Sequence, residues 1–129
     1  MTFESGFDQS DKAALDLIGQ LEDQLDSDVS IRKHIDTEYV LSSRGLTRLI
    51  LDIHTHEKII KIIDIEAERK GEGVGSEVVR SLAEIAVENG YALIAENVSH
   101  SLDSWWRNRG FSPNSPHSAD YVFRDNNDL

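Results

Sequence analysis

The chain has 129 residues, of which 39% are hydrophobic and 29% charged, with a formal net charge of -11 and no cysteine. This length fits one domain, residues 1–129, and the acidity argues against a nucleic-acid binder, which normally carries a basic face. The lack of cysteine excludes disulfides, thiolate metal sites and cysteine nucleophiles. Apolar runs are too short for a membrane span, and the first residues lack the pattern of a secretory signal, so we expect a cytoplasmic protein.

The first half of the chain predicts a helix followed by an antiparallel meander. Apolar residues follow helical spacing over 11–25, with Ser10 in the position of an N-cap. Residues 29–41 alternate between apolar and polar and contain one or two strands, and a turn follows at 43–45. The next strand is expected over 46–54.

The second half predicts the order strand, helix, strand, helix, strand. The strand at 59–65 is apolar on both faces, which is typical of a central strand that is covered on both sides. A helix over 75–89 leads to a strand at 91–98, which we expect to run parallel to its predecessor because a helix connects them. A short helix at 101–109 and a strand at 121–124 complete a mixed α/β domain with helices on both sheet faces.

The turn between the central strand and the following helix is rich in glycine. It reads "ERKGEGVGSEVV", residues 68–79, with Gly71, Gly73 and Gly75 alternating. Glycine costs about 0.5–1 kcal/mol relative to alanine in an ordered element, so the pattern indicates positive φ angles or a close approach to the backbone. Free N–H groups at a helix start bind phosphates, which favours a phosphorylated cofactor over a mere tight connection.

Two known phosphate-binding motifs do not fit this turn. A Walker loop needs Lys-Ser or Lys-Thr after its glycines, and a dinucleotide fingerprint needs G-x-G-x-x-G spacing within a doubled strand–helix–strand framework. Neither feature is present. The remaining comparison is with acyl-CoA loops.

The segment "IDIEAERKGEGVGSEVV", residues 63–79, resembles the acetyl-CoA loop of the GNAT family of N-acetyltransferases. The family pattern is Gln/Arg-x-x-Gly-x-Gly/Ala, and residues 70–75 fill it, with lysine in the first position. A second family landmark, an aromatic residue followed by three residues and then Gly-Phe, matches "WWRNRGF" at 105–111. The two matches cover residues 59–111. The resemblance implies a GNAT-like fold and transfer of an acetyl group from acetyl-CoA to a primary amine.

The resemblance also implies roles for individual residues. Backbone groups of Ile63 and Ile65 would pair with the pantetheine arm, which requires a neighbouring strand that splays away. Lys70 would add a point charge for the phosphates. The pyrophosphate would lie on backbone N–H groups of six consecutive residues: Gly71, Glu72, Gly73, Val74, Gly75 and Ser76.

The sequence offers several candidates for the general acid and for the general base. Trp106 stands where the family often has a tyrosine that protonates the departing thiolate, and an indole cannot act as that acid. We expect Trp105 and Trp106 to pack in the core and in the wall of the cofactor site. Ser99, Ser101 or a water could supply the proton instead. The amine, with a pKa near 10.4, needs a base, and a carboxylate acting through water is the usual solution. The candidate bases are Glu66, Glu96, Asp64 and Glu38.

The acceptor cannot be named from these residues. The acidic charge favours a cationic acceptor, either a small molecule such as a polyamine or a basic protein. No metal site is expected, since His54 and His56 have no third ligand nearby. The family resemblance makes a homodimer an expectation. Two alternatives stay open: a catalytically silent GNAT-fold module that binds CoA or a protein partner, and an acidic decoy that masks a basic protein.

Overall fold

The computed structural model describes residues 1–3 and 6–125 and contains one mixed sheet in the order β1-β2-β3-β4-β5-β6-β8-β7. The strands are β1 (Thr2–Phe3), β2 (Ser30–Lys33), β3 (Glu38–Ser43), β4 (Leu46–His54), β5 (Ile59–Ala67), β6 (Ala92–Ala95), β7 (Phe111–Pro113) and β8 (Tyr121–Phe123). The helices are α1 (Lys12–Leu25), α2 (Val74–Asn89) and α3 (Asp103–Arg107), with 3-10 turns η1 (Gln9–Asp11) and η2 (His100–Leu102). In the described part of the chain, no helix is long and apolar enough to span a membrane.

The strand connections confirm the predicted α/β order. Strands β2 to β5 form an antiparallel meander, and β6 runs parallel to β5 after the crossover through α2. The span 29–41 contains two strands. Strand β1, which pairs in parallel with β2, was not predicted, because two residues are too short to show a periodic pattern.

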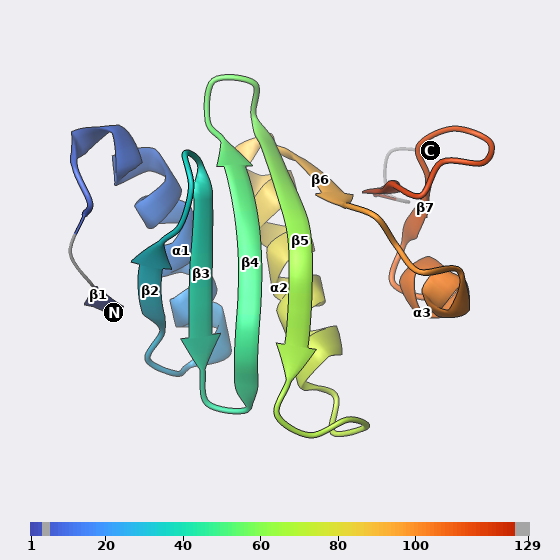
Figure 1. The fold of residues 1–129 in the computed structure, drawn as a ribbon, viewed down its shortest axis with the longest axis horizontal. Helices are drawn as coiled ribbons and strands as arrows, with labels where there is room; N and C mark the ends of the chain where they lie inside the picture. Colours follow the sequence, from blue (N-terminus) through green and yellow to red (C-terminus); the bar gives the residue numbers. More distant parts are fainter. Residues whose placement is uncertain (4–5, 126–129) are drawn as a thin grey trace.

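The core lies between the sheet and the two long helices, which are both behind the same face in Figure 1 and contact each other. Strand β4 contributes Leu49, Leu51 and Ile53, each at most 2% exposed. Burying such side chains stabilises the fold by about 1.5–3 kcal/mol each. The residues of α2 that face this core are Val78, Val79, Leu82, Ile85 and Ala86. Helix α2 ends at Gly90, whose φ of 75° supports the left-handed C-cap.

Strand β5 is covered on one face only, so the prediction of two covered faces is wrong. Ile60 and Ile62 are buried, whereas Ile59, Ile63 and Ile65 are partly exposed. Among the described residues, no helix lies over the other face of β3, β4 and β5 (Figure 1). The expectation of helices on both sheet faces therefore fails for this region.

Helix α1 begins at a buried polar cluster. Asp8, rather than the predicted Ser10, caps the preceding turn, because its Oδ1 accepts a hydrogen bond from the Ser10 N–H at 2.9 Å. Asp11 is 1% exposed and accepts hydrogen bonds from the Tyr39 hydroxyl at 2.6 Å and from Lys33 Nζ at 3.2 Å. Burial raises the pKa of Asp11, but these hydrogen bonds outweigh burial and lower the pKa overall. The cluster ties the start of α1 to β3.

Candidate functional site

Strands β5 and β6 pair along their first residues and then separate. Their register runs from Ile59 opposite Ala92 to Ile62 opposite Ala95, and the Glu96 N–H donates to Ile62 O at 3.0 Å. Strand β5 continues to Ala67 without a strand partner on the β6 side, within the residues described. Figure 1 shows β6 diverging from β5 toward α3. An extended ligand can pair with an exposed strand edge of this kind.

The separation is fixed by the residues that follow β6. The Val98 N–H donates to Ala119 O at 2.7 Å, and the Asn97 N–H donates to Asp120 Oδ1 at 2.9 Å. Asn97 has a φ of 54°, a left-handed conformation that asparagine tolerates better than most residues. The chain therefore bonds to the segment before β8 and leaves the second half of β5 uncovered.

The other edge of β5 carries a β-bulge. Its register with β4 shifts between Ile50 and Leu51, which leaves Ile63 as the extra residue. Bulges re-aim backbone groups and are frequent beside active sites. Ile63 and Ile65, the residues predicted to pair with pantetheine, both lie beyond the last β5–β6 pair. The structure thus has the splayed strand that the prediction required.

The glycine turn connects this open edge to α2. Gly71 and Gly73 have φ angles of 85° and 81°, and a Cβ at either would meet no heavy atom within 4 Å. Gly75 has no such angle, and a Cβ there would lie 3.6 Å from the Trp105 ring, an ordinary contact. Backbone conformation therefore explains two of the glycines. Neither backbone conformation nor packing within the described residues requires the third.

The first turn of α2 presents free donors. The Glu77 N–H bonds to Gly73 O at 3.0 Å, so the N–H groups of Val74, Gly75 and Ser76 precede the first helical hydrogen bond. The Glu68 N–H donates to Gly45 O at 2.9 Å and so ties the start of the turn to the connection between β3 and β4. With the positive end of the helix dipole, these groups favour an anion.

Charged side chains beside the glycines have a modest role in the turn. Glu72 is exposed and lies 3.8 Å from Arg69 across the turn. Lys70 is exposed and makes no side-chain hydrogen bond or ion pair with the described residues. Backbone groups, rather than these side chains, are thus the fixed part of the turn.

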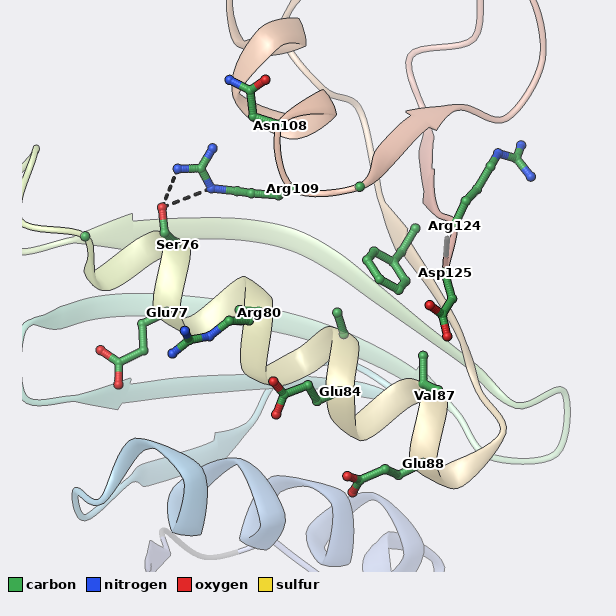
Figure 2. Close-up of a pocket in the computed structure, with 14 residues that line it drawn as sticks. Ser76, Glu77, Arg80, Glu84, Val87, Glu88, Asn108, Arg109, Arg124 and Asp125 are labelled. Carbon is green, nitrogen blue, oxygen red and sulfur yellow. Dashed lines mark hydrogen bonds between the residues drawn. The ribbon is translucent and has the colours of Figure 1, made fainter. Parts of the chain in front are cut away.

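A groove of about 970 Å³ begins at the start of α2 and runs along its solvent side. In Figure 2, Ser76, Arg80 and Arg109 lie at one end, and Glu84 and Glu88 lie farther along the helix. Sequence reasoning missed both arginines. The available signals were that Arg80 stands one helical turn after Ser76 and that Arg109 directly precedes the Gly-Phe landmark.

Arg109 reaches from the end of α3 to the start of α2. Its Nε and Nη2 donate to Ser76 Oγ, the former at 3.0 Å, and its Nη1 donates to Trp105 O at 2.7 Å. The guanidinium carbon lies 3.8 Å from the centre of the Trp105 ring. Burial lowers the pKa of Arg109. The side chain is thus fixed at the edge of the predicted phosphate site.

Two of the candidate bases are engaged by one arginine. Arg48 Nε donates to Asp64 Oδ2 at 2.6 Å, and Arg48 Nη2 lies 3.0 Å from Glu66 Oε2. The hydrogen bond that Arg48 donates to Asp64 raises the pKa of Arg48. All three side chains are at least 40% exposed, so solvent screens the network and it contributes little to stability.

The other catalytic candidates are dispersed. Glu96 is exposed, follows β6 where the strands part, and has no ion pair within the described residues. Ser99 is also exposed, and its hydroxyl lies 2.9 Å from that of Ser101. Glu38 is on β3, opposite Asp52 of β4, and is therefore two strands away from β5. No group of three potential metal ligands occurs in the described residues.

The two tryptophans have different surroundings. Trp106 is 5% exposed, and its ring lies 4.8 Å from that of Trp105 and 5.0 Å from that of Phe111, both edge to face. This placement fits the packing role considered for Trp106. Trp105, which sequence reasoning left without a specific contact, is the tryptophan beside Gly75 and Arg109.

No protein-family model and no curated protein matches the sequence. Among solved structures, the chain is similar to a Bacillus subtilis acetyltransferase in complex with CoA, with a TM-score of 0.51, 16% identity and coverage of 92% of this chain and 93% of that one. Two looser likenesses are to nourseothricin acetyltransferase (TM-score 0.45, 19% identity, 66% of this chain and 60% of that one) and the anti-CRISPR protein AcrVA5 (0.47, 16%, 76% and 98%). The chain therefore spans less than two thirds of nourseothricin acetyltransferase. The first likeness confirms the GNAT-like fold expected from the sequence.

Proposed function

We propose that the chain is an acyl-CoA N-acyltransferase that transfers an acetyl group from acetyl-CoA directly to a primary amine. The observation that carries this proposal is the open edge of β5 directly before the glycine turn. One continuous segment offers strand pairing for an extended pantetheine and then N–H donors for a pyrophosphate, in the order in which CoA joins these parts. The Bacillus subtilis acetyltransferase of the same fold was solved with CoA, which supports the same ligand here.

The chemistry would rest on positioning. Pairing of the pantetheine arm with β5 brings the thioester to the fork between β5 and β6, where a backbone N–H near Ile65 polarises its carbonyl. The amine nitrogen attacks the carbonyl carbon, a C–N bond forms and the C–S bond breaks. The proton lost by the amine passes to a carboxylate through water, and the CoA thiolate takes a proton from solvent or from a serine such as Ser99.

Glu96 is the best-placed base among the candidates. It lies at the fork and is free of ion pairs within the described residues, whereas Asp64 and Glu66 are held by Arg48. A carboxylate already engaged by a guanidinium is a poorer proton acceptor. The acceptor in this proposal is cationic, a small amine or a basic protein, because the net charge is -11 and these carboxylates are exposed.

A catalytically silent CoA-binding module is the second candidate. It is favoured by the residue in the position of the family's tyrosine, because Trp106 is buried against Phe111 and offers no acid. In this alternative the chain binds CoA but does not catalyse acetyl transfer. The two candidates therefore differ in turnover and agree in binding.

The test is a calorimetric titration of acetyl-CoA into the wild type and into the double variant Gly73→Asp, Gly75→Asp. We expect saturable binding by the wild type and its loss in the variant, since the carboxylates repel phosphates. The matched control is Gly90→Asp, which alters the positive-φ glycine at the other end of α2 and should leave binding intact. A folded wild type that binds no acetyl-CoA would overturn both candidates.

A screen of amines for released CoA thiol then separates the candidates. Thiol release that depends on the amine supports the transferase. Binding without release by any amine, including polyamines and lysine-rich peptides, supports the silent module.

A further inference from the structure

Charge is unevenly distributed along the groove beside α2. The end next to the glycine turn has Arg80, Arg109 and Glu77, and neither arginine has an ion pair within the described residues. Farther along, the groove is lined by Glu84 and Glu88 of α2 and by Arg124 and Asp125 after β8. Figure 2 shows the two ends separated along the helix. In a chain with 24 acidic residues, a groove end with two arginines and one carboxylate is suited to an anionic group.

Arg109 is the better fixed of the two arginines. A guanidinium has five N–H donors, and three of them are used in the hydrogen bonds to Ser76 and Trp105. Two donors remain without a partner in the described structure. Stacking on the Trp105 ring and the bonds to Ser76 hold the plane of the fork, so a ligand would lose little side-chain freedom on binding.

No described partner of Arg109 carries a compensating charge. Its partners are a hydroxyl, a carbonyl and an aromatic face, all neutral, and burial lowers its pKa. A partly buried guanidinium without a carboxylate is stabilised when an anion binds beside it. Ser76, its anchor, is also a residue of the first turn of α2, where the free N–H groups lie.

We infer that Arg109 binds the phosphates of the cofactor and gives the site its preference for ligands that carry phosphate. This inference rests on the proposed function, because the anion is the phosphate of an acyl-CoA. Lys70, which the sequence resemblance assigned to the phosphates, has a secondary role, because it is exposed and unanchored on the turn. The guanidinium of Arg109, across the groove from the turn, supplies the bidentate contact that the Lys70 ammonium cannot make.

A purely structural role for Arg109 makes a different prediction. If Arg109 only ties α3 to α2, its loss weakens every ligand equally or weakens none. If it binds phosphate, its loss weakens CoA and spares pantetheine, which has no phosphate. The two roles are therefore separated by comparing the same variants with both ligands.

The experiment measures the binding of CoA by calorimetry, and of pantetheine by ligand-observed NMR, to the wild type and four variants. The variants are Arg109→Gln, Arg109→Lys, Lys70→Gln and the groove control Arg124→Gln. We expect Arg109→Gln to weaken CoA roughly 10- to 100-fold, the usual effect of losing hydrogen bonds to a charged group. The CoA affinity of Arg109→Lys should lie between those of the wild type and Arg109→Gln. Lys70→Gln and Arg124→Gln should change CoA affinity less than about 5-fold. Pantetheine affinity should be unchanged in all four variants.

Three results would contradict the proposals in distinguishable ways. Equal CoA affinity in Arg109→Gln overturns the inference and leaves the proposed function standing. Equal losses for CoA and pantetheine also overturn it, in favour of a structural role. A wild type that binds neither ligand overturns the proposed function itself. Should Arg109→Gln fail to fold, Ser76→Ala replaces it. Removing the anchor should weaken CoA by a smaller factor and spare pantetheine, whereas unchanged CoA affinity would count against the inference.

Discussion

The two halves of β5 have similar apolar residues but different surroundings. Residues 59–62 pair with β4 on one side and β6 on the other, and Ile60 and Ile62 are 1% and 2% exposed. Residues 63–67 pair with β4 alone, begin with a bulge at Ile63, and include the exposed Glu66. The difference shows that one part of a strand can be fixed in the core while the next part leaves its edge exposed to a ligand. The buried half fixes the backbone position that the open half presents to a ligand.

Shortening an isoleucine in the buried half should have the largest effect on stability. Ile60→Ala removes a side chain from the core between β5 and the helices, and we expect a loss of about 2–5 kcal/mol in the free energy of unfolding. The control is Ile63→Ala at the bulge, which should lose less than half of that because Ile63 is already partly exposed. Denaturant unfolding monitored by circular dichroism measures both. Equal losses would mean that the second half is packed as tightly as the first.

The comparison extends to two polar clusters, one linked to the buried half through β4 and one in the open half. Tyr39, which donates to Asp11, pairs with Leu51, and Leu51 pairs with Ile62 in the buried half. Asp64 belongs to the open half. We expect Asp11→Asn to lower the free energy of unfolding by about 1–3 kcal/mol at pH 7, since it weakens buried hydrogen bonds. Asp64→Asn should change it by at most about 1 kcal/mol, because its ion pair is exposed.

Asp11→Asn should also change the pH dependence of stability. The pKa of Asp11 is lower in the folded chain than its usual value, so its contribution to stability is present above about pH 4 and is lost as the pH falls through the folded pKa. Asp11→Asn should therefore flatten the acid end of the stability curve. A curve that keeps the wild-type slope would show that other carboxylates cause the acid loss.

Much of this fold was predictable because its elements obey simple periodicities. The bounds of β4 and the buried stripe of α2 follow directly from apolar spacing, and Gly90 marks the helix end. The bulge at Ile63 was not predictable, since a run of isoleucines looks alike with or without one extra residue. The same run of isoleucines, read without the bulge, predicted that β5 is covered on both faces.

The site was predictable only in its local parts. Gly71 and Gly73 predict the turn, because the positive φ angles at these two positions favour glycine. Arg109 was missed because its contact with Ser76 joins residues that are 33 positions apart, and no local pattern encodes such a meeting. Long-range contacts of exposed or half-buried side chains are set by the assembled fold.

The smallest expected effect on stability comes from Arg48→Met, which removes the cation of the open half and frees Asp64 and Glu66. Both ion pairs are exposed, so the free energy of unfolding should change by less than about 1 kcal/mol. If Glu96 is the base, the pH profile of kcat/KM for acetyl transfer should stay as in the wild type, and Glu96→Gln should remove its acidic limb. A rate increase in Arg48→Met that disappears when Glu66→Gln is added would instead identify Glu66 as the base. In that case the acceptor ammonium would replace Arg48 beside Glu66, and the open half of β5 would supply the base as well as the ligand edge.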